Sequence, residues 1–172
     1  MVTFDRNEMT ERDMIDLYEL VLGGFYHPAM KGSNSIKQVL PAVIESSMFL
    51  QKKYSQSIYG TMSIPSLNLN NHIWLLKNEQ DRWISPYKTL PQIFEDIDDE
   101  LLDSLNFEPG EELSDGGAAM MAYAKMQFTE MHPQERNLYR NALLRYCEPD
   151  TLAMVMIYEA WREEIKNSQL TT

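Results

Sequence analysis

The residues of this chain that could do chemistry are a tyrosine and an aspartate near its C-terminal end, Tyr146 and Asp150. They lie four positions apart, so a helix that runs through them, or restarts with a small offset, presents the phenol and the carboxylate on one face about a turn apart. A carboxylate can bind a hard divalent cation, and a neighbouring phenol can orient a metal-bound water by hydrogen bonding. The alternative is a half-buried tyrosine beside an aspartate that favours a helix N-terminus.

The elements that must position these two residues are helical. The segment 136–161 has helical character on both sides of a Glu148-Pro149 step. Proline lacks an N–H and is tolerated in the first turn of a helix but not in its interior. The sequence therefore predicts two consecutive helical segments that meet at this step.

A second group of candidate residues lies near the N-terminal end, and it could bind substrate. Ser35 followed by Gln38 is the pattern of a capping box, which predicts a short helix that Pro41 interrupts or restarts. The N–H groups at that helix start, together with Lys31 and Lys37, could hold a phosphate. The alternative is a loop packed by its aromatic residues, with solvated lysines.

Composition limits the class of protein. With 172 residues, 44% of them hydrophobic and 24% charged, the chain is expected to fold as a single domain, 1–172. A net charge of −11 excludes a diffuse basic surface, so any contact with nucleic acid needs metal ions or a local cluster of Lys and Arg. The single cysteine, Cys147, excludes an internal disulfide and fits a cytoplasmic protein. We find no apolar run of about 18 residues and no signal peptide, so no membrane association is expected.

The remaining pattern predicts further helices around an irregular stretch. We expect one helix at about residues 11–22, and another that starts after residue 115 and ends at His132-Pro133. Pro133 is expected to start the helix that follows. Residues 48–112 look like an insertion, in which HIWLL and RWISPY could form a hairpin around KNEQD. The predicted fold class is mainly α, with several helices and at most a short β-hairpin.

The chain contains, in order, the segments IDLYELV, YHPAMKGSNSIKQVLPAVI, LSDGGAAMMAYAKM and ALLRYCEPDTLAMVMIYEAW. Together these four segments resemble the C-terminal half of an uncharacterised bacterial family. Its members look like RNase-H-like, DnaQ-like exonuclease domains of the DEDDy type, often carried behind a RecB-type nuclease region. The two signatures are GSNSIKQVLP, at Gly32–Pro41, and YCEPDTLAMV, at Tyr146–Val155. The resemblance covers Asp16 to about Val43 and Leu113 to Trp161.

The resemblance implies a divalent-metal-dependent 3′–5′ exonuclease that uses Mg or Mn. Asp150 would be a metal-binding carboxylate, Tyr146 would orient the attacking water, and two ions about 3.5–4 Å apart would assist phosphodiester hydrolysis. The family's Asp-x-Glu on a first strand has no counterpart here, because only fifteen residues precede Asp16. The chain therefore resembles the C-terminal helical half of an RNase-H-like α/β fold, incomplete or inactive alone.

Three interpretations stay open. The first is this nuclease-type domain, with nucleic acid as substrate and with a missing N-terminal half or a second copy of the chain as partner. The second is a non-catalytic helical interaction or regulatory module, for which Met-rich helices and an acidic face are suited. The third, an acidic mimic of nucleic acid, depends on the net charge of −11 alone.

Overall fold

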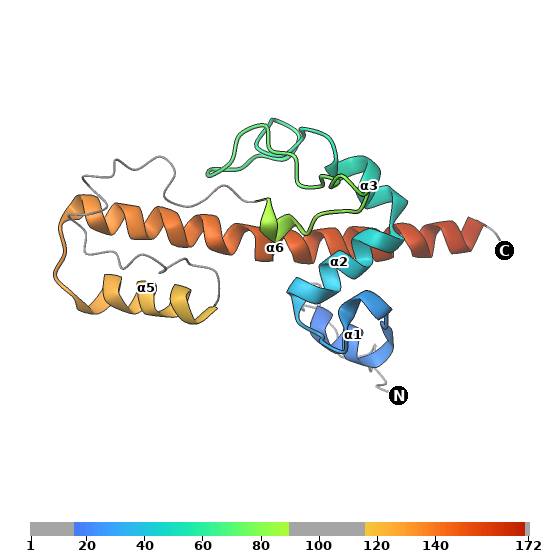
Figure 1. The fold of residues 1–172 in the computed structure, drawn as a ribbon, viewed down its shortest axis with the longest axis horizontal. Coiled ribbons are helices and arrows are strands. Elements are labelled where there is room, and N and C mark those ends of the chain that lie inside the picture. The colour runs from blue at the N-terminus through green and yellow to red at the C-terminus, as the bar shows by residue number, and fades with distance from the viewer. Residues whose placement is uncertain (1–15, 90–115, 171–172) are drawn as a thin grey trace, which may run out of the picture. The chain divides into compact units, whose positions relative to one another are not determined.

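The computed structural model describes residues 16–89 and 116–170. These residues are mainly helical and contain isolated β-bridges but no sheet (Figure 1), which confirms the predicted fold class. The chain divides into two compact units, which we call unit 1 (residues 1–51 and 153–172) and unit 2 (residues 52–152). The single domain expected over 1–172 stays a prediction.

The helices are distributed over both units. Unit 1 contains α1 (Leu17–Gly24), the 3-10 helix η1 (Pro28–Met30) and α2 (Ile36–Ser46), and α3 (Met48–Tyr54) crosses into unit 2. Unit 2 contains the 3-10 helix η2 (Pro86–Lys88) and α5 (Gly116–Phe128). The last helix, α6 (Pro133–Leu170), contributes its first half to unit 2 and its second half to unit 1.

Helix α6 passes through Pro149 without a break (Figure 1), so the prediction of two helical segments was wrong. An interior proline removes one N–H and crowds the preceding turn, which normally ends or kinks a helix. Here the residues that follow are deeply buried, with Leu152 at 7%, Ala153 at 0% and Met156 at 1% exposure. Their burial stabilises the helical conformation on the C-terminal side of the proline and offsets the lost hydrogen bond.

Helix α2 also contains a proline. The prediction of where and how this helix starts was only partly correct. Ser35 is the N-cap residue, as expected, but its side chain makes no capping hydrogen bond, so the predicted capping box is not formed. Pro41 lies inside the helix and does not interrupt it. Its neighbours Leu40 and Ala42 are fully buried in unit 1, and this packing favours the continuous helix.

Helix α1 is capped at its N-terminus by an aspartate. Asp16 is the N-cap residue, and its Oδ1 accepts a hydrogen bond of 2.8 Å from the backbone N–H of Tyr18. The predicted helix of residues 11–22 therefore begins at Leu17 within the described part of the chain, and residues 11–15 lie outside it. In the same unit, the Phe25 and Trp161 rings pack 5.4 Å apart.

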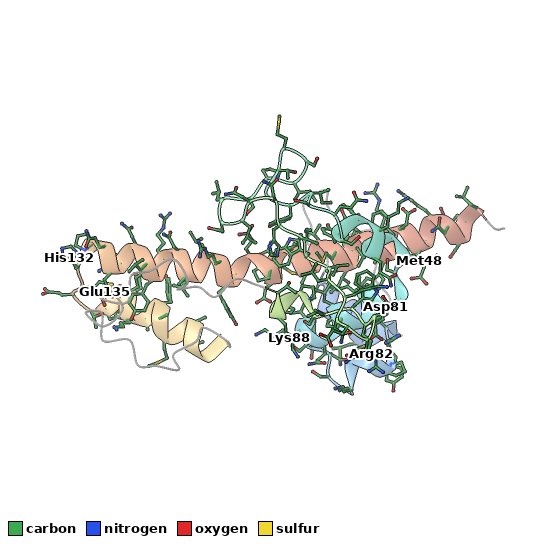
Figure 2. All side chains as sticks on the ribbon, turned by 45° about the horizontal axis from the view of Figure 1, so that its top comes forward. Met48, Asp81, Arg82, Lys88, His132 and Glu135 are labelled. Carbon is green, nitrogen blue, oxygen red and sulfur yellow. The ribbon has the colours of Figure 1, made fainter. Side chains whose placement is uncertain are left out.

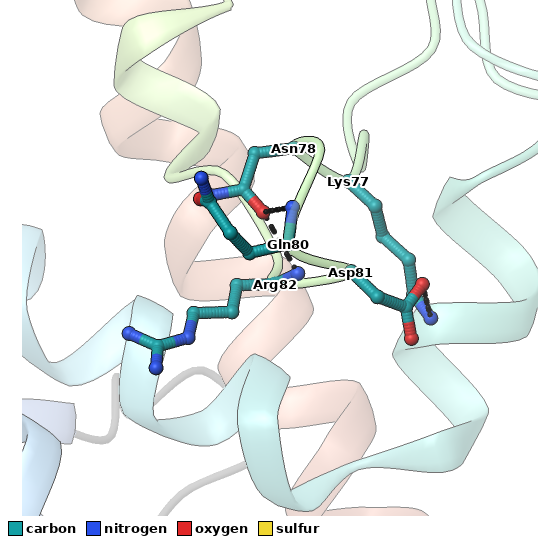
Figure 3. Close-up of polar contacts among 5 residues, drawn as sticks. All are labelled: Lys77, Asn78, Gln80, Asp81 and Arg82. Carbon is teal, nitrogen blue, oxygen red and sulfur yellow. Dashed lines mark hydrogen bonds and ion pairs between the residues drawn. The ribbon is translucent and has the colours of Figure 1, made fainter.

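The predicted hairpin in unit 2 is reduced to an isolated antiparallel bridge between Lys77 and Trp83. The turn between them is drawn in Figure 3: Asn78 Oδ1 accepts a hydrogen bond of 3.0 Å from the backbone N–H of Gln80. Lys77 Nζ and the Asp81 carboxylate form an exposed ion pair at 2.8 Å. Local side-chain contacts thus fix the turn without a regular strand on either side.

Helices α5 and α6 pack through small and aromatic residues in unit 2. Ala122, Tyr139 and Ala142 are buried at this contact. The Lys125 ammonium donates a hydrogen bond of 2.7 Å to the Tyr139 hydroxyl. Pro133 is the first residue of α6, as predicted, directly after His132, which Figure 2 labels at that end of the helix.

Candidate functional site

Tyr146 and Asp150, the two residues predicted to do chemistry, lie one turn apart on α6 in unit 2. Because the helix is continuous, their four-residue spacing places both side chains on one face. Both are half-buried, and Tyr146 packs against the buried cluster of Ala122, Tyr139 and Ala142. The helical spacing assumed from the sequence is therefore present.

A third residue that the sequence did not indicate, Tyr87, joins this pair. It lies in η2 and is half-buried. Burial raises the pKa of the Tyr87 phenol, and the adjacent Asp150 carboxylate raises it further, as a hydrogen-bond acceptor and as a negative charge, with a smaller contribution from Tyr146. Tyr87 therefore stays protonated at neutral pH.

The Asp150 carboxylate has spare capacity to bind. Its Oδ1 atom is buried, and no donor among the described residues reaches it with hydrogen-bonding geometry. A buried acceptor without a donor is costly unless a water, ligand or cation satisfies it. This atom can therefore accept a hydrogen bond from a water or a ligand, or bind a cation.

The described residues do not by themselves form a two-ion magnesium or manganese site. Among residues 16–89 and 116–170, no three His, Cys, Asp or Glu side chains come together in a group that could hold a metal ion. Glu148 is close in sequence, but two residues on a helix turn by about 200°, which places it on another face of α6 from Asp150. The described residues thus supply one carboxylate, and Mg²⁺ or Mn²⁺ needs further oxygen ligands.

Glu148 instead holds a separate network in unit 2. Its Oε1 accepts hydrogen bonds from the Tyr59 hydroxyl, at 2.6 Å, and from the Ser66 hydroxyl. Its Oε2 accepts a hydrogen bond of 2.6 Å from the Asn68 side-chain amide. One carboxylate on α6 therefore binds three side chains of the loop between residues 55 and 76, which we call the Glu148 network.

The electrostatics of this network keep Glu148 ionised. Burial alone would raise the pKa of Glu148, but the hydrogen bonds from Ser66, Tyr59 and Asn68, with the charge of nearby His72, lower it overall. Burial raises the pKa of Tyr59, and its hydrogen bond to Glu148 raises it further. A carboxylate that is ionised and saturated with donors is suited to hold the loop rather than to transfer protons.

The loop itself is built around Trp74, which is 1% exposed. The rings of Tyr59 and His72 meet it edge-on, with centroids 5.3 Å and 4.5 Å away. Gly60 has a φ of +70°, and a Cβ there would lie 2.0 Å from the Leu69 carbonyl oxygen, so only glycine fits. The Glu148 network is therefore anchored to a small core of its own.

The three predicted substrate-binding residues gather at the start of α2 in unit 1. Lys31 is exposed and adopts a left-handed conformation, with φ 52°, at the end of η1. Ser35 is the exposed N-cap residue of α2, and Lys37 lies half-buried in the first turn. They belong to a different unit from Tyr146 and Asp150, and their role in binding substrate stays a prediction.

Sequence reasoning missed Tyr87 and the Glu148 network because both depend on long-range contacts. Glu148 and its three donors are separated by 80 to 89 positions. The one local signal was the position of Glu148 directly before an interior proline, which was interpreted only as a helix boundary.

Two observations concern membranes and known proteins. In the described parts of the chain, no helix has the length and apolar character required to cross a membrane. Comparisons with protein-family models, with curated proteins and with solved structures found no match to this chain.

Proposed function

We propose that this chain is the C-terminal part of a divalent-metal-dependent 3′–5′ exonuclease-like domain and that it is inactive on its own. The observation that carries the proposal is the position of Tyr146 and Asp150 on one turn of an unbroken helix, with Asp150 Oδ1 buried and lacking a donor. The order of the two sequence signatures, at Gly32–Pro41 and Tyr146–Val155, supports the same ancestry. Nucleic acid is the proposed substrate, and the cytoplasm, which suits the single exposed cysteine, is the proposed location.

In this proposal the described residues position groups and do not complete a reaction. Asp150 contributes one carboxylate, Tyr87 places a protonated phenol beside it, and Tyr146 presents a phenol one turn away. The remaining carboxylates would come from a partner polypeptide or from a preceding part of the protein. Residues Lys31, Ser35 and Lys37 are proposed to contact the phosphates of the substrate.

The first test measures binding of Mn²⁺ by nuclear magnetic resonance. In the polypeptide extended by the sequence encoded upstream of Met1, paramagnetic Mn²⁺ should broaden the backbone signals around Asp150 and Tyr87, and Asp150→Asn should abolish that broadening. Asp81→Asn is the matched control, because Asp81 is an exposed carboxylate of the same unit that pairs with Lys77. Broadening that is absent near Asp150, or that survives in Asp150→Asn, would refute the assignment of Asp150 as a metal ligand.

The second test separates an incomplete nuclease from a complete one. Labelled single-stranded DNA and RNA should stay intact when incubated with the chain and Mn²⁺. Cleavage should appear when the polypeptide is extended by the sequence encoded upstream of Met1, and should be lost again with Asp150→Asn. Cleavage by the chain alone would contradict the proposal that its active site is incomplete.

A second candidate function, a helical interaction module, is favoured by one observation. Helix α5 exposes four large apolar side chains: Met120 at 72%, Met121 at 73%, Tyr123 at 56% and Phe128 at 88%. Such a face is suited to protein contacts, including contact with a second copy of the chain. Asp150→Ala distinguishes the two functions, because a loss of stability or of self-association favours the module, whereas unchanged folding with lost cleavage in the extended polypeptide favours the nuclease.

A further inference from the structure

A groove of about 540 Å³ lies within unit 1, lined by residues of α1, of the start of α2 and of the second half of α6. Ligand sites for small molecules typically have volumes of about 300–1,000 Å³ and are mostly apolar, with a few polar groups that fix orientation. The groove has this character, and its apolar and aromatic lining includes Tyr18, Val21, Val39, Met154, Ile157 and Tyr158.

Some of the residues that line the groove are buried in the core, and others are exposed to solvent. Val21, Val39 and Ile157 are 5%, 2% and 3% exposed, so they belong to the core of unit 1. Tyr18 and Tyr158 are 55% and 51% exposed, so much of their ring surface faces solvent. A ligand that covered them would bury apolar surface that the chain itself leaves exposed.

The groove contains a negative charge, which favours a ligand of positive charge. Among the described residues that line it, Asp16 carries the only formal charge. One oxygen of this carboxylate, Oδ1, accepts the hydrogen bond from the Tyr18 N–H that caps α1. A carboxylate has about four acceptor positions, so Asp16 keeps capacity for a further donor.

The two tyrosines favour the same ligand charge. The face of an aromatic ring attracts a cation, and both tyrosines line the groove that Asp16 also lines. An anionic ligand would meet the Asp16 carboxylate unfavourably, and a neutral ligand would gain no ion pair with it.

We infer that this groove binds a small molecule that joins an apolar body to a positively charged amine. The apolar body packs on Val21, Val39 and Ile157, and the ammonium group donates to Asp16 beside the rings of Tyr18 and Tyr158. The site belongs to unit 1 and does not depend on the nuclease proposal, which concerns Tyr146 and Asp150 of unit 2.

The test titrates the full chain with three probes of similar size and different charge. The probes are 4-phenylbutylamine, 4-phenylbutanol and 4-phenylbutyrate, and binding is followed through backbone amide chemical shifts. We expect saturable shifts for the amine at groove residues on three elements, such as Tyr18, Val39 and Tyr158. The alcohol should bind about five-fold more weakly, and the carboxylate more weakly still, because each lacks the ion pair with Asp16.

Two substitutions test whether Asp16 recognises the positive charge of the ligand. Asp16→Asn should reduce the affinity for the amine to that for the alcohol, and asparagine preserves the cap of α1 because it is an equally good N-cap residue. The matched control is Glu19→Gln, which removes an exposed carboxylate of the same helix that does not line the groove. This control should leave the affinity for the amine unchanged.

A third substitution tests the aromatic contribution. Tyr158→Leu keeps an apolar side chain but removes a ring. It should therefore lower the affinity for the amine about two- to five-fold, and the affinity for the alcohol much less. Equal affinities of the wild-type chain for amine and alcohol would overturn the inference. Equal losses in Asp16→Asn and Glu19→Gln, or shifts confined to residues outside the groove, would overturn it too.

Discussion

Glu148 shows how one side chain can fix the position of a loop that has little regular secondary structure. Its two oxygens accept three hydrogen bonds, from Tyr59, Ser66 and Asn68. Hydrogen bonds to a charged acceptor stabilise more than neutral ones, and loss of the acceptor leaves half-buried donors unsatisfied. The loop and α6 should therefore lose stability together when Glu148 changes.

Glu148→Gln is expected to lower the free energy of unfolding by about 1–3 kcal/mol. The glutamine oxygen can still accept from Tyr59 and Ser66, but its amide nitrogen meets the Asn68 amide, which is also a donor. Chemical denaturation measures the effect. Glu79→Gln, which changes an exposed acid of the same unit, should stay within about 0.5 kcal/mol of wild type, and an equal loss in both variants would contradict the role of the network.

The pH dependence of stability follows from the same residue. Burial would raise the pKa of Glu148, but its hydrogen bonds and nearby His72 lower it below the ordinary value of 4.5. A folded-state pKa below the unfolded value means that the stabilisation is present above pH 4.5 and is lost as pH falls through the folded-state pKa. We expect the difference in free energy of unfolding between wild type and Glu148→Gln to shrink below pH 4.5, whereas a constant difference down to pH 3 would show that the charge of Glu148 is unimportant.

At the scale of elements, local patterns predicted helices well and their interruptions poorly. The start of α6 at Pro133 followed from the sequence, because proline suits the first turn of a helix. Pro41 and Pro149 were interpreted as interruptions, yet both lie inside continuous helices. The deciding factor, burial of Leu40 or Leu152 against other elements, is tertiary and cannot be read from neighbouring positions.

The candidate site divides in the same way. The one-turn relation of Tyr146 and Asp150 is local and was predictable from their spacing. The contribution of Tyr87 was not, because it lies 63 positions before Asp150 in an irregular stretch. What the sequence provided was one face of a helix, and the residues that meet that face come from elsewhere in the chain.

A pair of prolines in α6 provides a prediction at this scale. Pro149→Ala restores the hydrogen bond of an interior N–H and should raise the free energy of unfolding by about 1–3 kcal/mol. Pro133→Ala, at the first position of the same helix, should not raise it, because no intrahelical partner awaits that N–H. Thermal and denaturant unfolding measure both variants, and a loss of stability in Pro149→Ala would show that packing of the buried ring outweighs the missing hydrogen bond.

At the scale of the whole molecule, one stretch of this acidic chain has more basic than acidic residues and also exposes apolar side chains. The chain carries a net charge of −11, yet residues 116–147 contain four Lys or Arg and only two Asp or Glu. The same stretch includes α5, whose apolar residues occur on two sides. One side packs on α6 through Ala119, Ala122 and Met126, and the opposite side exposes Met121 and Phe128.

A helix that is apolar on two sides is normally covered on both. Its outer side should therefore bind hydrophobic probes and promote self-association at high concentration. The double substitution Met121→Glu with Phe128→Glu should reduce the fluorescence of bound anilinonaphthalene sulfonate and the concentration-dependent increase in sedimentation coefficient. Helix content should be unchanged, because both side chains are 73% or more exposed and glutamate is a good helix former.

Met62→Glu is the matched control, because Met62 is fully exposed at 103% but stands in a loop of the same unit rather than on α5. A single exposed apolar side chain is ordinary on a protein surface, so this substitution should change neither measurement. If Met62→Glu reduced dye binding as much as the double substitution, charge alone would explain the effect. The outer side of α5 would then not be a surface that requires a partner.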